Sequence, residues 1–342
     1  MRAAVYNPYL DTLGGGERYS MAFAKALVEL GYAVEVEWKD REIKKKLEDR
    51  FGSKLDGVSV VDDIGRGDGY DVCFWVSDGS IPMVRARRNV LHFQVPFRKV
   101  GGKTLLNRMK LFRFGSVVCN SYFTKSFIDE EFGVKSSVIY PPVDVDKIKA
   151  KRKENLILYV GRFSTLKQSK GQEKLVEAFR FFYDGGNKSF RLVLAGGVEV
   201  GVGDFVDGLR KEAEGYPISI VESPSYKKLL EYYGKAKFFW SAGGYGVDED
   251  RRPERVEHFG ISVVEAMAAG AVPLVFNAGG HKEIVKEGES GFLWNNIEEL
   301  VERTASLVAD KKEYASISKR CVAESRRFGY ERFKEEVKKL LE

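Results

Sequence analysis

Three cations precede the helix pattern in VGRFSTLKQSKGQEKLVEAF (residues 160–179), where a strand pattern gives way to a helix pattern. Arg162 leaves the end of the strand, and Lys167 and Lys170 come just before the helix. Two or three cations beside a helix N-terminus are the groups that hold a diphosphate when no metal is bound. Surface exposure explains either lysine taken alone, but it explains Arg162 less well.

Two glutamates lie eight positions apart in EHFGISVVEAMAAG (residues 257–270). Ser262 and Glu265 have the spacing of a capping box, which would give Glu265 a structural role at N3 of a helix. That box does not account for Glu257. Nor does it account for the stretch Phe259-Gly260-Ile261, whose backbone N–H groups would point out of the helix start. Glu257 is therefore the stronger functional candidate.

The glycine-rich loop LGGGER (residues 13–18) lies between the first strand and the first helix. Gly15 and Gly16 would let a ligand approach the backbone at a helix N-terminus, which favours an anion. The loop lacks the G-x-G-x-x-G spacing of a dinucleotide site, and a tight packing turn explains it equally well. His92, in LHFQVPF near the end of another strand, is either a buried core histidine or a side chain facing the ligand.

These residues are positioned by short apolar runs that alternate with amphipathic stretches, which predicts parallel sheets covered by helices on both faces. We expect an α/β fold of two doubly wound Rossmann-like domains, residues 1–150 and 151–327, facing a central cleft. Ligands bind beyond the carboxyl ends of strands in such sheets. The predicted strands are 2–6, 33–38, 71–76, 89–94, 116–121 and 136–142, then 156–162, 191–197, 218–223, 237–242, 273–277 and 291–294.

The three cysteines, Cys73, Cys119 and Cys321, are far apart and odd in number. They exclude a disulfide framework and offer no metal-ligand spacing, which favours a reducing compartment. The N-terminus lacks the apolar region of a signal peptide, and no run approaches the ~20 apolar residues of a membrane span. We therefore expect a cytoplasmic protein, with peripheral contact to the inner face of the cell membrane as an open alternative.

The charge of +6 is unevenly distributed. Residues 79–128 contain ten Lys or Arg and no acid, so they contribute +10 and leave −4 for the rest of the chain. A solvated helix face is one interpretation, and a face for anionic lipid or an anionic acceptor is the other. No nucleic-acid-binding motif accompanies the patch, so no nucleic acid is expected. The bases mixed with apolar residues in this segment are Arg98, Lys99, Lys103, Arg108, Lys110 and Arg113.

Taken together, these stretches resemble glycosyltransferase family 4, whose members have the GT-B fold. EHFGISVVEAMAAG resembles the E-x7-E signature of that family, and VGRF…KG resembles its diphosphate loop. NSYFTKSFIDEEFGVKSSVIYPPVD (120–144) and AGGHKEIVKEGESGFLW (278–294) match other family segments in the right order. The resemblance covers nearly the whole chain and is closest to mannosyltransferases that act on lipid-linked or polysaccharide acceptors.

The resemblance implies retaining transfer of a hexose, mannose or glucose, from a GDP- or UDP-linked sugar to a glycan or lipid-linked acceptor, without a metal or cofactor. Glu257 would bind the hydroxyls of the donor sugar and Glu265 those of the ribose. Arg162 and a lysine would bind the diphosphate. The final helix (328–342) would cross back onto the first domain. Gly15, Gly16, His92 and the amides of Phe259, Gly260 and Ile261 would complete the donor site.

Two features depart from the family pattern. The usual spacing from Arg162 selects Lys167, whereas the helix register selects Lys170. Ser241 follows a strand where close relatives often carry histidine. The charged loop 243–256 is either a mobile lid or a solvated loop.

Three other functions remain open: a nucleotide-sugar epimerase of the same fold, a glycogen-type synthase, and a non-catalytic protein that binds nucleotide sugars or glycans. The presence of Glu257, Glu265, Arg162 and His92 together favours the transferase.

Overall fold

The computed structural model describes residues 1–164, 170–199 and 201–342. The chain divides into two compact units, one formed by residues 1–142 with 330–342 and the other by residues 143–329. The boundary falls at Val143 and not at residue 150, because Val143 is buried and pairs with Gly329 in a short parallel bridge. Within the described residues, no helix is both long and apolar enough to cross a membrane.

The first unit contains a parallel sheet in the order β3-β2-β1-β4-β5-β6-β7. Its strands are β1 (Arg2–Tyr6), β2 (Ala33–Glu37), β3 (Val58–Val61), β4 (Val72–Val76), β5 (Arg88–Phe93), β6 (Ser116–Cys119) and β7 (Ser137–Val138). Its helices are α1 (Gly15–Glu29), α2 (Ile43–Phe51), α3 (Leu105–Leu111), α4 (Tyr122–Phe132) and α12 (Tyr330–Leu341). Two short 3-10 helices, Leu10–Thr12 and Gly65–Gly67, lie in its loops.

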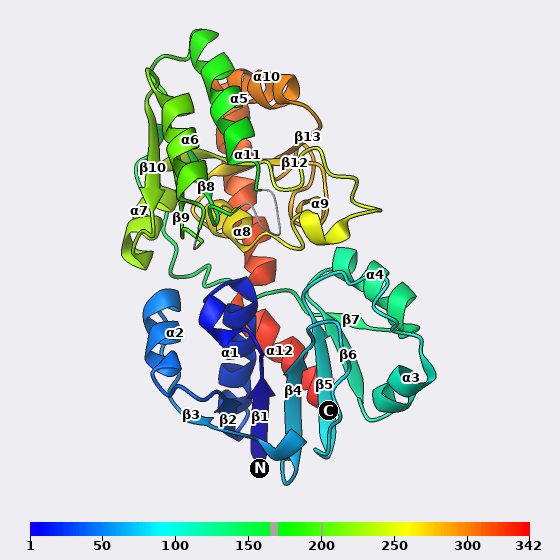
Figure 1. Ribbon diagram of the computed structural model, residues 1–342. Coiled ribbons are helices and arrows are strands. Elements are labelled where there is room, and N and C mark those ends of the chain that lie inside the picture. The colour runs from blue at the N-terminus through cyan, green and yellow to red at the C-terminus, as the bar shows by residue number, and fades with distance from the viewer. Residues whose placement is uncertain (165–169, 200) are drawn as a thin grey trace. The chain divides into compact units, whose positions relative to one another are not determined.

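Two apolar clusters cover the two faces of this sheet. One joins α1, α2 and α12 to side chains such as Val5 and Phe74. The other joins α4 to side chains such as Trp75 and Phe93. The last helix, α12, contributes Phe333 and Val337 to the first cluster, and Figure 1 shows it in red among the blue elements of this unit.

The second unit contains a parallel sheet in the order β10-β9-β8-β11-β12-β13. Its strands are β8 (Glu154–Val160), β9 (Arg191–Gly196), β10 (Ile218–Glu222), β11 (Ala236–Ser241), β12 (Val272–Phe276) and β13 (Phe292–Trp294). Its helices are α5 (Gln172–Asp184), α6 (Gly203–Ala213), α7 (Tyr226–Lys235), α8 (Ile261–Ala268), α9 (His281–Ile284), α10 (Ile297–Ala309) and α11 (Lys311–Ser325). Two further 3-10 helices span Pro253–Arg255 and Arg326–Phe328.

Both sheets reverse their strand order at one place, between β1 and β4 in the first and between β8 and β11 in the second. The predicted α/β class with two doubly wound parallel sheets is therefore confirmed. Such a reversal opens a crevice at the carboxyl ends of the two strands, where ligands bind in this class of fold. The loops that follow β8 and β11 carry Lys170 and Glu257 respectively.

Candidate functional site

The start of helix α5 places Lys170, two residues before it, at the carboxyl end of the second sheet. Gly171 is the N-cap residue of α5 and has the left-handed φ of 64°. A Cβ on Gly171 would lie 2.7 Å from the Cβ of Ala242, which directly follows β11. Only glycine lets the helix start this close to the strand end, and Lys170 is the residue before it.

Lys170 and Glu257 form an ion pair across 87 residues of sequence. The Nζ of Lys170 donates to Oε2 of Glu257 at 2.8 Å, and the two side chains are 17% and 22% exposed. Burial by itself would raise the pKa of Glu257. The positive charge of Lys170 and its hydrogen bond outweigh that effect and lower the pKa to about 2. Glu257 is therefore an anion at neutral pH, fixed at the crevice next to a cation.

His281 supports this pair from the buried side. It is fully buried, its Nδ1 lies 2.9 Å from the carbonyl oxygen of Phe276, and its Nε2 lies 3.2 Å from Oγ of Ser241. A carbonyl only accepts, so Nδ1 carries the proton and Nε2 accepts from the hydroxyl of Ser241. Burial lowers the pKa of His281, with Glu257 opposing, which keeps the ring neutral.

The backbone around Glu257 is held by two glycines of the loop after β12. The N–H of Gly280 donates to the carbonyl of Glu257 at 2.8 Å. A Cβ on Gly279 would lie 2.2 Å from that same carbonyl oxygen, and a Cβ on Gly280 would lie 2.5 Å from the Cα of Phe259. The sequence AGGH (278–281) thus brings the loop after β12 against the backbone of Glu257, and the same contact places His281.

The capping-box alternative for Ser262 and Glu265 is wrong. Helix α8 begins at Ile261 with Gly260 as its N-cap, at a φ of 113°, so Ser262 already lies inside the first turn. Because glycine alone adopts that φ readily, Gly260 and not Ser262 sets the start of the helix. The first N–H groups of any helix have no partner within it, so the helix itself does not pair those at Ile261 and Ser262.

Glu265 is buried inside α8 and accepts a hydrogen bond from the hydroxyl of Tyr233 at 2.8 Å. This contact joins α7 to α8, so the structural contact of Glu265 is with Tyr233 and is not the one that a capping box would give. Phe259, just before the helix, is buried and its ring contacts that of Phe328 edge to face at 5.3 Å. Its side chain is therefore core, while its backbone lies at the helix start.

Arg162 follows β8 and has an exposed side chain. Its carbonyl accepts from Nε2 of Gln172 at 2.7 Å, which ties the loop to the first residue of α5. Lys167 lies outside the described residues, so the choice between Lys167 and Lys170 rests on the position of Lys170 alone.

The glycine loop of the first unit also opens a helix. Gly15 and Gly16 are the first residues of α1, and Glu17 accepts from the N–H of Gly14 at 2.7 Å. A Cβ on Gly16 would lie 2.0 Å from Oε1 of Gln94, so the Gln94 amide lies directly on Gly16. The sequence reading missed Gln94, the residue just past the end of β5.

His92 lies two residues earlier and is fully buried. Its ring stacks on that of Tyr19 at 4.1 Å, and burial lowers its pKa to about 3. With no exposed surface, this side chain is a core residue under α1 in this structure. Its predicted contact with a donor sugar remains a prediction, and Gln94 is the side chain of this strand end that reaches the glycine loop.

The loop 243–256 is attached to its surroundings at two places. Glu249 accepts from the N–H of Gly279 at 2.7 Å and pairs with Lys282 at 2.5 Å. Tyr245 packs on Phe276 and Trp294, with ring centroids 5.2 and 5.6 Å away. A freely solvated loop would not need these contacts, which attach it to the surrounding elements. Among the residues that the structure describes, no three His, Cys, Asp or Glu side chains are grouped so as to hold a metal ion.

The sequence profile of the glycosyl transferases group 1 matches residues 143–322, more than half of the chain and almost the whole second unit. The chain belongs to this family. Its match takes in the loops that carry Arg162, Lys170, Glu257 and His281.

Two similar proteins are both named GDP-Man:Man(3)GlcNAc(2)-PP-Dol alpha-1,2-mannosyltransferase. The one from Dictyostelium discoideum is 27% identical over 66% of this chain and 46% of its own length. The one from Neurospora crassa is 29% identical over 64% of this chain and 43% of its own. The chain thus spans less than half the length of either relative.

The crystal structure of Anabaena HepE in complex with UDP and glucose matches the fold. It superposes with a TM-score of 0.75 at 16% identity, over 99% of this chain and 98% of HepE. The chain therefore has the α/β fold with two doubly wound sheets that the resemblance implied.

Proposed function

We propose that this protein is a family 4 retaining glycosyltransferase. It transfers a hexose from a nucleotide-diphosphate sugar to a glycan or lipid-linked acceptor, without a metal. The observation that carries the proposal is the Lys170–Glu257 ion pair at the point where the second sheet reverses its order. An ionised carboxylate and a cation at this crevice match the two ends of such a donor, the sugar hydroxyls and the diphosphate.

Lys170 and Arg162 supply the charges for the diphosphate. Both lie beside the N-terminus of the thirteen-residue helix α5, whose dipole adds to their field. Charge develops on the diphosphate as it leaves, so fixed cations stabilise the transition state more than the bound donor. This is the contribution that a metal ion makes in other transferases.

Glu257 orients the donor sugar. Because its carboxylate is ionised and held by its contacts with Lys170 and the 279–281 loop, it accepts hydrogen bonds from sugar hydroxyls without reorganising. In the transfer step, the bond between the anomeric carbon and the diphosphate oxygen breaks. The acceptor oxygen bonds to the same face of that carbon, and its proton goes to the departing phosphate oxygen. No side chain acts as a general base.

The names of the relatives favour GDP-mannose as donor and a glycan on a lipid diphosphate as acceptor. UDP-glucose is the second candidate, because the fold neighbour HepE was crystallised with UDP and glucose. Glu265 would contact the ribose in either case, and Gly15 and Gly16 the phosphates. A cytoplasmic location fits both donors, which are made in that compartment.

The test is release of nucleoside diphosphate from GDP-mannose and UDP-glucose, with and without polyprenyl-diphosphate glycans. We expect release with one donor, sustained in EDTA, and an axial anomeric configuration in the product by NMR. An inverted product would contradict the retaining mechanism. Nucleotide binding with no release from either donor would favour a non-catalytic binding protein. Interconversion of the sugar without an acceptor would favour an epimerase.

A further inference from the structure

Helix α3 exposes large apolar side chains in an unusual concentration. Phe112, just after the helix, is 94% exposed, Leu105 is 75%, Met109 is 64% and Leu106 is 62%. The helix itself has no buried residue. A contiguous group of exposed large apolar side chains marks an interaction surface, whereas single ones do not.

The exposed group is a face of the helix. Leu105, Met109 and Phe112 follow the spacing i, i+4, i+7, which places them in one stripe. Leu111 and Phe114 lie on the other side and pack against the cluster beneath the sheet that contains Phe93 and Phe132. The segment thus has enough apolar residues to attach itself to the unit and still presents a second apolar stripe outward. Figure 1 shows α3 at the margin of the first unit, on the side of β6 and β7.

Cations border this stripe. Arg108 and Arg113 are exposed, and on helical spacing they lie on opposite sides of it, while Lys99 and Lys103 are exposed in the loop before α3. Two other bases of the predicted basic face contact groups within the protein. Lys110 donates to the carbonyl of Ile81 at 2.9 Å, which anchors the helix, and Arg98 lies over the ring of Phe127.

The loop that presents these bases is fixed by Glu131 of α4. Its carboxylate accepts from the N–H groups of Lys99 at 2.8 Å, Val100 at 3.0 Å and Gly102 at 3.1 Å. A Cβ on Gly102 would lie 2.5 Å from the carbonyl of Glu131, so the approach requires glycine. Glu131 therefore fixes the conformation of this loop through its backbone amides.

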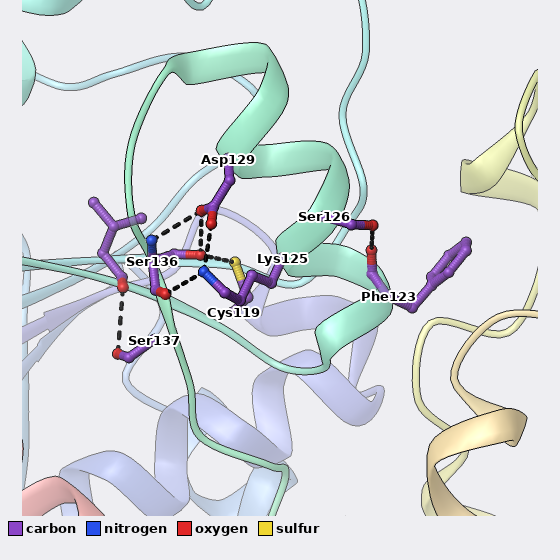
Figure 2. Close-up of polar contacts among 8 residues, drawn as sticks. Cys119, Phe123, Lys125, Ser126, Asp129, Ser136 and Ser137 are labelled. Atoms are coloured by element: carbon purple, nitrogen blue, oxygen red, sulfur yellow. Dashed lines mark hydrogen bonds and ion pairs between the residues drawn. The ribbon is translucent and has the colours of Figure 1, made fainter.

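Helix α4 is itself held firmly. Figure 2 shows Asp129 accepting from the N–H and hydroxyl of Ser136 and pairing with Lys125, which also donates to the carbonyl of Ser136 at 2.6 Å. The thiol of Cys119 on β6 donates to the same hydroxyl at 3.4 Å. Helix α4 is thus joined to β6 and to the segment that leads into β7.

We propose that α3 and the loop before it dock this protein on an anionic lipid bilayer. Leu105, Leu106, Met109 and Phe112 enter the interfacial layer, and Lys99, Lys103, Arg108 and Arg113 contact lipid phosphates. An occupant of this surface has to be apolar in the centre and negatively charged around it, which describes the boundary between acyl chains and anionic headgroups. This inference does not depend on transferase activity.

The test is co-sedimentation of the full chain with phosphatidylcholine vesicles that contain 0% or 30% phosphatidylglycerol. We expect binding only to the anionic vesicles. The variant R108S/R113S should bind about 25-fold more weakly, since a base near such a surface contributes about fivefold. The variant M109S/F112S should lose at least tenfold. Circular dichroism and the Tm should not change, because these side chains are exposed.

The controls replace exposed arginines and an exposed phenylalanine elsewhere with serine. R41S/R50S removes two exposed arginines from another part of the first unit, and F181S removes a phenylalanine that is 59% exposed in α5. Both should stay within twofold of the wild type. A Trp placed at Phe112 should shift its emission to the blue with anionic vesicles and be quenched by brominated acyl chains.

Two results would overturn the proposal. The first is binding that R41S/R50S weakens as much as R108S/R113S, because it would mean attraction by total charge alone. The second is no vesicle binding together with a dimer that M109S/F112S dissociates in light scattering, which would assign the stripe to a second copy of the chain.

Discussion

Removing either partner of the Lys170–Glu257 pair has a calculable effect on stability. The pKa of Glu257 falls from 4.5 to about 2, which corresponds to at most about 3 kcal/mol of favourable interaction with its surroundings. Both partners keep some contact with water, which screens part of this interaction. We therefore assign about 1.5 kcal/mol to Lys170. Lys170→Met should lower the Tm by about 3–6 °C, given ~2–4 °C per kcal/mol for a unit of this size.

The double variant K170M/E257Q should lose less than the sum of its single variants, because the unpaired charge that each leaves behind is then absent. Lys188→Met is the matched control. Its Nζ also lies 2.8 Å from a carboxylate, that of Asp184, but both side chains are more than half exposed. Such a surface pair contributes about 0.5 kcal/mol or less. Additive single variants would refute a coupled pair.

Titration calorimetry with GDP, UDP and their sugars extends the same test to function. Lys170→Met should weaken nucleoside diphosphate binding by at least tenfold, the effect of one lost charge-assisted contact. Glu257→Gln should keep or raise the affinity for the diphosphate and weaken only the sugar-bearing donor. If Lys170→Met left diphosphate affinity within twofold of the wild type, the proposed donor site would be wrong.

Three more predictions follow from single contacts. Tyr233→Phe should lower the free energy of unfolding in urea by about 1–3 kcal/mol, because it removes the donor to buried Glu265. Glu265→Gln should unfold like the wild type and bind nucleotide less well. The reverse pattern would give Glu265 a purely structural role. Burial lowers the pKa of Lys153 from 10.5 to about 8, so between these pH values the unfolded chain binds more protons and stability rises with pH. Lys153→Met should remove about 2 kcal/mol of the rise in unfolding free energy between pH 7 and pH 10. An unchanged rise would contradict the shift. Gly16→Ala should leave the stability of the wild type nearly unchanged, because Gln94 must move aside. In a Gln94→Ala background the same change should stabilise by up to about 1 kcal/mol, since only the helix preference for alanine remains. Equal effects in both backgrounds would exclude the contact between Gly16 and Gln94.

The strands of both sheets were visible in the sequence because buried parallel strands form continuous apolar runs. The runs at 191–197 and 273–277 correspond to β9 and β12 within a residue or two. The strand β3, Val58–Val61, was not predicted. It has four residues, lies at the sheet edge and buries only Val58 fully, so its apolar pattern is short and weak. Edge strands of this length resemble loops in sequence.

The site was predicted in part, for physical reasons that differ between its residues. Glu257 was a candidate because of its spacing from Glu265, and Lys170 because it is one of the cations before a helix. Their mutual contact joins residues 87 positions apart and leaves no local pattern. The S-x-x-E spacing at Ser262 is the same inside a helix as at its start. The start was set by Gly260, whose left-handed φ a sequence pattern does not reveal.

The two histidines show how burial decides such cases. His92 and Gln94 differ by two positions and so point to the same face of β5 and its continuation, but α1 covers His92 through Tyr19 and leaves Gln94 at the glycine loop. His281 carried a visible signal that was not used: it follows two glycines directly after a strand, where the backbone can approach a neighbouring loop. Its partners Ser241 and Phe276 then fix its tautomer.

The Lys170–Glu257 pair also bears on how the proposed transferase would tell its donor from its product. A diphosphate that draws Lys170 away leaves Glu257 as a carboxylate with little water and no cation, which costs free energy. A nucleotide sugar offsets that cost, because its hydroxyls donate to Glu257 while its phosphates bind Lys170. The free nucleoside diphosphate offers no such donors. The wild type should therefore prefer the sugar-bearing donor and release the product after transfer. Glu257→Gln should bind both with similar affinity, since an amide left without a cation carries no uncompensated charge.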